Sequence, residues 1–216
     1  EAEFDGSGLQ PGDRVGAYAI RRLLGRGGMG AVYLAERDDD TYHQEVVVKL
    51  VDAPMSESLH LRFQRERQIL ADLAHPHIAR LLDGGSLADG TPYLVMEYVD
   101  GVSIAAYCDE RDLGIRERVA LFRQVADAVQ FAHANLVVHR DIKPSNVGFS
   151  AQGAAKLLDF GQVSAEGAPR GHAPRPTGES GHFMGSERLP GTAAYMSPEA
   201  LAGAPPSAAD DIWALA

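Results

Sequence analysis

Three residues with chemically useful side chains lie within the stretch His139-Arg140-Asp141-Ile142-Lys143-Pro144-Ser145-Asn146. Asp141, Lys143 and Asn146 bring a carboxylate, an ammonium group and an amide together on one short segment. A carboxylate can accept a hydroxyl proton, an ammonium group neutralises phosphate charge, and amide and carboxylate oxygens suit Mg²⁺. This set of groups is what phosphoryl transfer requires. Asp and Asn also cap ordinary turns, so other parts of the chain must support this interpretation.

A second segment with a metal-directed group, Asp159-Phe160-Gly161, follows thirteen residues after Asn146. Together the two segments resemble the catalytic loop and the metal-binding loop of the eukaryotic-like protein kinase family. The resemblance implies that Asp141 orients the acceptor hydroxyl and that Lys143 holds the γ-phosphate of ATP. It also implies that Asn146 and Asp159 bind Mg²⁺, for which Mn²⁺ is the expected substitute. A Lys two residues after the Asp resembles the Ser/Thr-specific branch of the family.

The elements that must position these groups begin with the glycine-rich stretch Gly25-Arg26-Gly27-Gly28-Met29-Gly30. β-Branched and aromatic residues predict a strand from Val15 to Leu24 and a returning strand from Ala31 to Ala35. A dinucleotide-binding glycine motif would open a helix instead, and a plain glycine-rich turn is the other alternative. The resemblance implies that this hairpin covers the nucleotide phosphates with Gly25, Gly27, Gly28, Gly30 and Val32.

A third predicted strand, Glu45 to Val51, carries one basic residue, Lys49. Residues 56–74 predict a helix, and Glu66 falls on its apolar face. Because a carboxylate that faces a core needs a partner, Lys49 is the obvious one. The resemblance implies that this ion pair positions the α- and β-phosphates of ATP. The alternatives are that Lys49 is an ordinary lysine of an edge strand and that Glu66 is solvated.

Residues 78–82 and 92–96 predict a further hairpin, with its turn running from Gly84 to Gly90. The next segment, residues 97–101, resembles the family's hinge, where backbone groups bind adenine. Val47 replaces the usual Ala above the base, and Gly148 replaces a large aliphatic residue below it. We therefore expect a bulkier residue above the adenine base (the roof of its site) and no large side chain below it (a missing floor). The adenine site implied by the resemblance comprises Val47, Met96, Glu97, Val99 and Gly148.

The chain after the hinge predicts a scaffold helix and a long loop. Residues 115–135 form the predicted helix, and residues 162–190, with five Gly and four Pro, form the loop at the place of the activation segment. The apolar stripe expected on the helix is Val119, Phe122, Val125, Val129 and Ala132. Arg140 resembles that of kinases whose segment is ordered by a phosphate, so autophosphorylation is expected in this loop. The available acceptors are Thr177, Ser180, Ser186 and Thr192.

Residues 191–199 resemble the family's substrate-positioning loop and its closing Ala-Pro-Glu, with Ser197 in place of the Ala. The resemblance implies that Thr192 positions Asp141 and Lys143 rather than serving as a phosphate acceptor. It also implies that Asp211 binds the backbone of the catalytic loop.

The composition excludes several other classes of protein. A formal net charge of −10 argues against non-specific binding to nucleic acid or to an anionic membrane. No apolar run approaches the roughly 20 residues that span a bilayer. A single cysteine, Cys108, cannot form an internal disulfide, so we expect a reducing, cytoplasmic location. Residues 1–4 resemble the remnant of an expression vector with a secretion leader, and we treat residues 1–13 as a flexible leader.

The resemblance implies an α+β, protein-kinase-like bilobal fold, with an antiparallel-sheet N-lobe over residues 14–97 and an incomplete helical C-lobe over residues 98–216. The family's C-lobe normally continues further, so we expect exposed apolar surface, marginal stability or self-association. The leading hypothesis is a Ser/Thr protein kinase that acts on protein hydroxyl groups. The alternatives are a nearly inactive nucleotide-binding or scaffolding module and an unrelated hydrolase, although no G-x-S-x-G or H-E-x-x-H motif is present.

Overall fold

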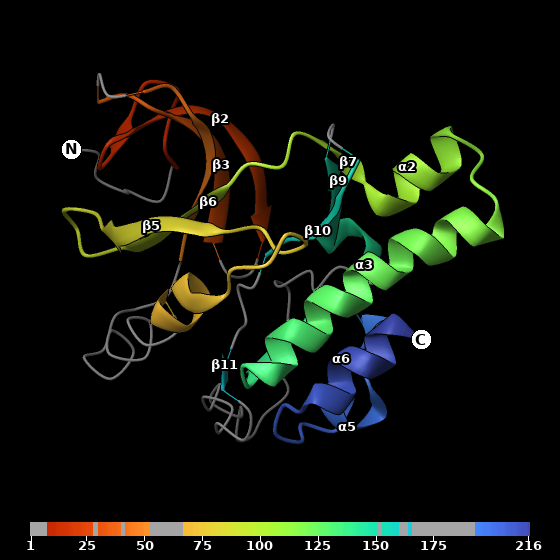
Figure 1. Ribbon diagram of the computed structural model, residues 1–216. Coiled ribbons are helices and arrows are strands. Elements are labelled where there is room, and N and C mark those ends of the chain that lie inside the picture. Colours follow the sequence, from red (N-terminus) through yellow and green to blue (C-terminus); the bar gives the residue numbers. More distant parts are fainter. Residues whose placement is uncertain are drawn as a thin grey trace, which may run out of the picture.

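The computed structural model describes residues 8–27, 30–39, 42–51, 67–150, 153–159, 164–165 and 193–216. In the N-terminal half of this part of the chain an antiparallel sheet dominates, and in the C-terminal half helices dominate (Figure 1). The long helix α3, Ile115–Ala134, runs through the C-terminal half with helix α6, Ala208–Leu215, beside it. This arrangement confirms the α+β fold that the sequence predicted.

The sheet of the N-terminal half has six strands in the order β1-β2-β3-β4-β6-β5. Alternation along β4 turns Val46, Val48 and Leu50 into the core of this half, because successive side chains of a strand point to opposite faces. Val47 and Lys49 therefore lie on the opposite face, which is the face of the candidate site. The strands are β1 Arg14–Val15, β2 Tyr18–Gly27, β3 Gly30–Arg37, β4 Glu45–Leu50, β5 Leu81–Ser86 and β6 Pro92–Glu97.

The hairpin of β5 and β6 differs from the prediction. Strand β5 runs through Gly84 and Gly85, which the sequence analysis assigned to the turn, and the turn lies at residues 87–91. Gly84 and Gly85 pair with Leu94 and Tyr93 of β6, and glycine suits residue 85 because a Cβ there would lie 2.8 Å from the hydroxyl oxygen of Tyr93. Before this hairpin, the described part of the predicted helix 56–74 is helical over residues 67–72 and ends two residues early.

The C-terminal half combines helices with two small antiparallel sheets, ordered β10-β9-β7 and β11-β8. Helix α3 matches its predicted bounds to within one residue, but its buried face is rotated. Leu121 and Ala128 are buried, whereas Val119 and Phe122 of the predicted stripe are exposed. The remaining elements are β7 Gly101–Ser103, α2 Ile104–Glu110, β8 Val137–Val138, η1 Pro144–Asn146, β9 Val147–Ser150, β10 Ala155–Leu157, β11 Ser164–Ala165 and α5 Pro198–Leu201.

The two halves are joined by the segment between the helical residues and β5. The N–H of Leu157 donates to the carbonyl of His77 at 2.8 Å, and the N–H of Ala79 donates to the carbonyl of Leu157 at 3.0 Å. Ile78 and Leu157 form a parallel bridge, and both belong to an apolar cluster that continues into α3. Strand β10, which leads to Asp159, is therefore held by backbone groups from both halves.

Helix α6 holds the predicted catalytic loop through Asp211, which is 1% exposed. Its carboxylate accepts the backbone N–H groups of His139 and Arg140, both at 2.8 Å. It also accepts a hydrogen bond from Nε2 of His133 on α3 at 2.8 Å. The structure thus confirms the predicted contact of Asp211 with the loop backbone.

Replacing Asp211 with Ala should lower the free energy of unfolding by about 3–5 kcal/mol, because three buried donors would lose their acceptor. Urea unfolding of the variant and the wild-type protein measures the difference. Asp109→Ala is the matched control, since Asp109 forms an exposed ion pair with Arg118 at 3.0 Å, and it should cost at most about 1 kcal/mol. Equal costs for the two variants would contradict the role given to Asp211.

Candidate active site

The sheet register brings four of the predicted site residues onto one face. Val32 of β3 pairs with Lys49 of β4, and Val47 pairs with Met96 of β6. Directly paired residues share a face, and so do residues two apart in one strand. Val32, Val47, Lys49 and Met96 therefore line the same side of the sheet.

The predicted catalytic loop converges on the carboxylate of Asp141. Lys143 Nζ lies 2.8 and 3.1 Å from its two oxygens, and Nδ2 of Asn146 donates to it at 2.9 Å. The same amide nitrogen donates to the carbonyl of Asp141 at 2.8 Å. The short 3₁₀ turn η1, between Lys143 and Asn146, brings the two side chains to one carboxylate.

The buried side chain of His139 contacts the backbone of this loop and is held in one tautomer. Its Nε2 faces the carbonyl of Leu158 at 2.9 Å and must donate, while its Nδ1 faces the N–H of Asp141 at 3.3 Å and must accept. Only a neutral imidazole satisfies both contacts. Burial of the ring lowers the pKa of His139, which favours the same neutral form.

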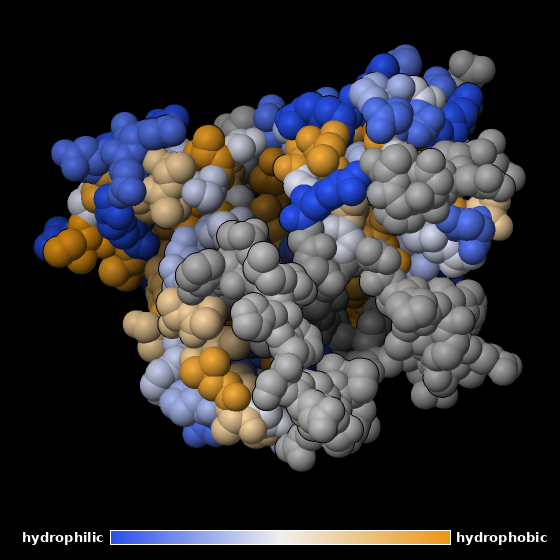
Figure 2. All heavy atoms as spheres, turned by 180° about the vertical axis from the view of Figure 1, so that it is seen from behind, coloured by the Kyte–Doolittle hydropathy of each residue, from blue (hydrophilic) through white to orange (hydrophobic). Residues whose placement is uncertain are grey.

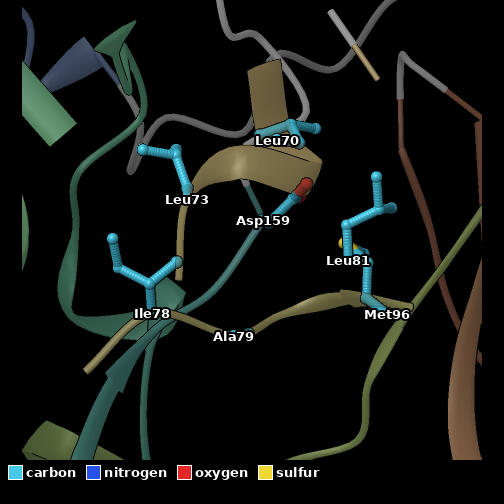
Figure 3. Close-up of a pocket in the computed structure, with 7 residues that line it drawn as sticks. All are labelled: Leu70, Leu73, Ile78, Ala79, Leu81, Met96 and Asp159. Atoms are coloured by element: carbon cyan, nitrogen blue, oxygen red, sulfur yellow. The ribbon is translucent and has the colours of Figure 1, made fainter. Parts of the chain in front are cut away.

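The carboxylate of Asp159 forms an ion pair with Nζ of Lys49, which is 5% exposed. The N–H of Leu158 donates to the carbonyl of Asn146 at 2.8 Å, so Asp159 follows directly after a residue bound to the catalytic loop. Figure 3 shows Asp159 beside a pocket whose apolar lining residues all belong to the N-terminal half. The other lining residues are Leu70, Leu73, Ile78, Ala79, Leu81 and Met96.

An ion pair of Lys156 with Glu97, at 2.8 Å, joins β10 to the start of the predicted hinge. The sequence does not predict this pair, because no local pattern connects residues 59 positions apart. Two residues further on, the N–H of Val99 has no hydrogen-bond acceptor among the described residues.

Below this hinge, the space expected to be empty at Gly148 is occupied. A Cβ at this position would lie 3.1 Å from Cδ1 of Leu158 and 3.3 Å from Cγ1 of Val99. These distances are shorter than ordinary van der Waals contacts. The expectation of a missing floor is therefore revised, because two neighbouring side chains fill the place next to Gly148.

Several predicted site residues lie outside the described residues. These are Gly28, Glu66 and Thr192, so the Lys49–Glu66 pair stays a prediction. Gly27 and Gly30 are paired at the end of the β2–β3 hairpin, and Gly25 pairs with Val32. Of the predicted loop 162–190 the structure describes Ser164 and Ala165, which pair with Val138 and Val137 just before the catalytic loop.

The oxygen donors fit a magnesium ion that is shared with phosphate groups. Both hydrogen bonds of Asn146 to Asp141 use the amide nitrogen, so its Oδ1 atom is left for another partner. Mg²⁺ in proteins is commonly held by one or two carboxylate or amide oxygens together with phosphate and water. Among the described residues there is no cluster of three or more His, Cys, Asp or Glu that could hold a metal alone. Asn146 and Asp159 therefore fit a metal that arrives with its nucleotide.

Comparison with known proteins gives consistent similarities. The family model described as "Protein kinase domain" matches residues 18–216. The Ser/Thr-protein kinase PknB of Mycobacterium tuberculosis is 35% identical over 92% of this chain and 31% of its own length. PknD of the same species is 36% identical over 94% of this chain and 32% of its own length. The crystal structure of the M. tuberculosis PknI kinase domain matches with a TM-score of 0.67 and 29% identity, covering 96% of this chain and 72% of that one.

The neutral state of His139 predicts a dependence of stability on pH. The pKa of His139 is about 6.5 in the unfolded chain and lower in the folded protein, so only the unfolded chain gains a proton as pH falls through this range. The stability from His139 is complete above pH 6.5 and is lost below it, at up to about 1.4 kcal/mol per pH unit. Urea unfolding of wild-type protein and His139→Asn should therefore give a difference that shrinks on acidification.

His43→Asn serves as the control, because the side chain of His43 is 88% exposed. Its difference from the wild-type protein should not shrink between about pH 7.5 and pH 5.5. A constant difference for His139→Asn over the same range would contradict the neutral, buried imidazole.

Proposed function

The chain belongs to the protein kinase domain family, as its sequence predicted, and we propose that it transfers the γ-phosphoryl group of ATP to Ser and Thr hydroxyl groups of proteins. The observation that carries the proposal is the convergence of Lys143 and Asn146 on the carboxylate of Asp141. An acceptor hydroxyl, a phosphate group and a metal ion would meet at these three side chains. The similarity to bacterial Ser/Thr kinases supports the choice of acceptor.

In this proposal Asp141 accepts the proton of the attacking hydroxyl group. The oxygen of that hydroxyl forms a bond to the γ-phosphorus, and the bond between the γ-phosphorus and the β,γ-bridging oxygen breaks, so that ADP leaves. Lys143, whose Nζ lies 2.8 Å from the carboxylate of Asp141, would neutralise the charge of the γ-phosphate. The buried ammonium group of Lys49 holds the α- and β-phosphates, and its ion pair with Asp159 ties it to the metal side of the site.

The rest of the nucleotide would lie along the shared face of the sheet. The glycines at residues 25–30 would cover the phosphates, and Val47 would cover the base. The N–H of Val99, which has no acceptor among the described residues, would donate to the base. Mg²⁺, held by Asn146 and Asp159, would neutralise the β- and γ-phosphate oxygens when it is bound with ATP.

The chain spans about a third of the length of the curated relatives, 31% of PknB and 32% of PknD. We therefore also propose the partner of the whole protein, which is a protein substrate that carries a Ser or Thr acceptor. A cytoplasmic location is supported by the lone buried Cys108. No helix in the described part of the chain is long and apolar enough to span a bilayer.

We also propose that copies of this chain associate with one another. Ile115, Val119 and Phe122 lie on one exposed stripe of α3, and Ile212 and Trp213 of α6 are also exposed. The face in Figure 2 carries its apolar residues in several groups among hydrophilic ones. Exposed apolar residues of this kind favour contacts between copies.

Replacing Asp141 with Asn should lower the rate of phosphoryl transfer about 10²- to 10⁴-fold, because the acceptor hydroxyl loses its base. Binding of ATP with Mg²⁺ should survive, since Asn keeps an oxygen for the Lys143 contact. Transfer is measured with labelled ATP and a library of Ser- and Thr-centred peptides. Binding is measured by thermal shift, and ATP at 100 times its Kd stabilises the folded state by about 2.7 kcal/mol.

Asp109→Asn, at an exposed position, should change neither measurement. Transfer by Asp141→Asn at the wild-type rate would refute the role of Asp141. Binding of ATP by a wild-type chain that transfers nothing would favour the scaffolding module. Phosphate release without any nucleotide-dependent labelling would favour a hydrolase.

Gly148→Leu should weaken ATP binding about tenfold, because its Cβ alone would crowd Leu158 and Val99. Leu158→Ala should weaken binding as well, because it removes apolar contact below the base. The double variant Gly148→Leu/Leu158→Ala should recover most of the lost affinity, since the new side chain takes the space of the old one. Titration calorimetry with ATP and Mg²⁺ measures all three. A gain in affinity for Gly148→Leu alone would mean that the floor was empty after all.

A further inference from the structure

Residues 8–13, which we call the strap, fold back onto the hairpin of β2 and β3. At one end of the strap, the N–H of Gly12 donates to the carbonyl of Ile20, and the N–H of Ile20 donates to the carbonyl of Asp13, both at 2.8 Å. The turn beside it is closed by two further hydrogen bonds. The N–H of Gln10 donates to Oδ2 of Asp13 at 2.7 Å, and the N–H of Asp13 donates to the carbonyl of Gln10 at 3.1 Å. The strap is therefore a structured segment that is fixed to β2.

The other end of the strap contacts both strands of the hairpin. Leu9 is 6% exposed and belongs to the same apolar cluster as Tyr33. The N–H of Leu9 donates to the hydroxyl oxygen of Tyr33 on β3 at 3.0 Å. A Cβ at Gly8 would lie 1.8 Å from Nη2 of Arg26, so the guanidinium group of this β2 residue lies against the backbone of Gly8.

These contacts lie on the face of the hairpin that is opposite the candidate site. Arg26 pairs with Ala31, and Ala31 and Tyr33 are two residues apart in β3, so the three residues share a face. Val32 lies between Ala31 and Tyr33 and therefore points to the other face, which it shares with Lys49. The strap thus covers the outer face of the hairpin whose inner face would cover the phosphates.

The glycine-rich end of the hairpin extends past its neighbouring strands. Strand β4 pairs with β3 no further than Val32, so Gly30 and Ala31 lie beyond this pairing. Strand β1 pairs with β2 no further than Ala19. Two strands that pair only with each other are marginally stable at best in water. The contacts of the strap therefore limit how far this end of the hairpin can move.

We propose that Leu9 and Tyr33 are positioning residues for the nucleotide phosphates, because the strap holds the glycine-rich end of the hairpin on its outer face. The inference rests on the proposed kinase function, in which residues 25–30 cover the phosphates. Loosening the strap lets the hairpin move away from the phosphates and so weakens the binding of ATP. Adenosine, which has no phosphate, is unaffected, because Val47 and Met96 of its site lie on β4 and β6.

The test compares Leu9→Ala, Leu9→Met and Tyr33→Phe with Leu87→Ala as the matched control. Leu87 is 9% exposed and belongs to the same apolar cluster, but it lies at the turn between β5 and β6. Titration calorimetry measures the Kd of ATP with Mg²⁺ and, separately, the Kd of adenosine. We expect Leu9→Ala and Tyr33→Phe each to raise the Kd of ATP about 3- to 10-fold, as for loss of one hydrogen bond or of part of a buried side chain. Leu9→Met, whose side chain has a similar volume, should stay within about twofold of the wild-type value.

The Kd of adenosine should be the same for all variants, and Leu87→Ala should lower the melting temperature without changing the Kd of ATP. An unchanged Kd of ATP for Leu9→Ala and Tyr33→Phe would overturn the inference. So would an equal loss of adenosine binding, an equal loss for Leu87→Ala, or no recovery by Leu9→Met.

Thermal unfolding identifies a variant that does not fold, and Tyr33→Phe, which loses only a hydroxyl group, then carries the test in place of Leu9→Ala. A wild-type chain that binds no ATP with Mg²⁺ contradicts the proposed function itself, and the inference falls with it. Wild-type binding of ATP that both variants retain in full contradicts the inference alone.

Discussion

A buried carboxylate is stable only when hydrogen-bond donors surround it, and Asp211 meets this condition with groups from two other elements. Its donors are two backbone N–H groups of the catalytic loop and a histidine of α3. The requirement works in both directions, since the loop backbone would otherwise bury two unpaired donors. The conformation of the loop, the end of α3 and the start of α6 therefore depend on one another. The geometry of Asp141, Lys143 and Asn146 is built on this arrangement.

Strand β10 and the residue after it connect the loop of Asp141 to the N-terminal half. Leu157 exchanges backbone hydrogen bonds with residues 77 and 79, Lys156 forms an ion pair with Glu97, and Leu158 is bound to Asn146 and His139. Each residue of this short run thus contacts a different part of the cleft. Asp159, which follows, is placed by all of these contacts and by Lys49. A small shift of β10 would therefore move Glu97, the loop of Asp141 and Asp159 together.

The sequence predicts well those features that depend on local pattern or on a long motif. The strands β3 and β4 follow from β-branched content, and the spacing of Asp141, Lys143 and Asn146 places the three groups on one short loop, although their mutual hydrogen bonds were not predicted. Features that depend on neighbours distant in the chain were missed. Gly85 indicates a turn by composition, but it pairs with Tyr93 of β6, and the absence of a side chain leaves room for the Tyr93 ring.

The same limit applies to the orientation of α3 and to pairs of distant residues. Val119 and Phe122 are apolar, but only the packing of the other elements decides that they lie outside the core. The contacts of Lys156 with Glu97 and of Ser197 with Asp210 join segments whose proximity exists only in the folded chain. The pairing of Lys49 with Glu66 stays a prediction, while the contact of Lys49 with Asp159 was not foreseen.

The crowding around Gly148 has a consequence for inhibitor design. A chemist who transfers a kinase inhibitor by aligned positions would treat residue 148 as a hole and would enlarge the compound to fill it. Such a compound would meet Leu158 and Val99 instead, at the distances that already crowd a single methyl group. Selectivity for this protein is better sought by a compound shaped to fit the side chains of Leu158 and Val99.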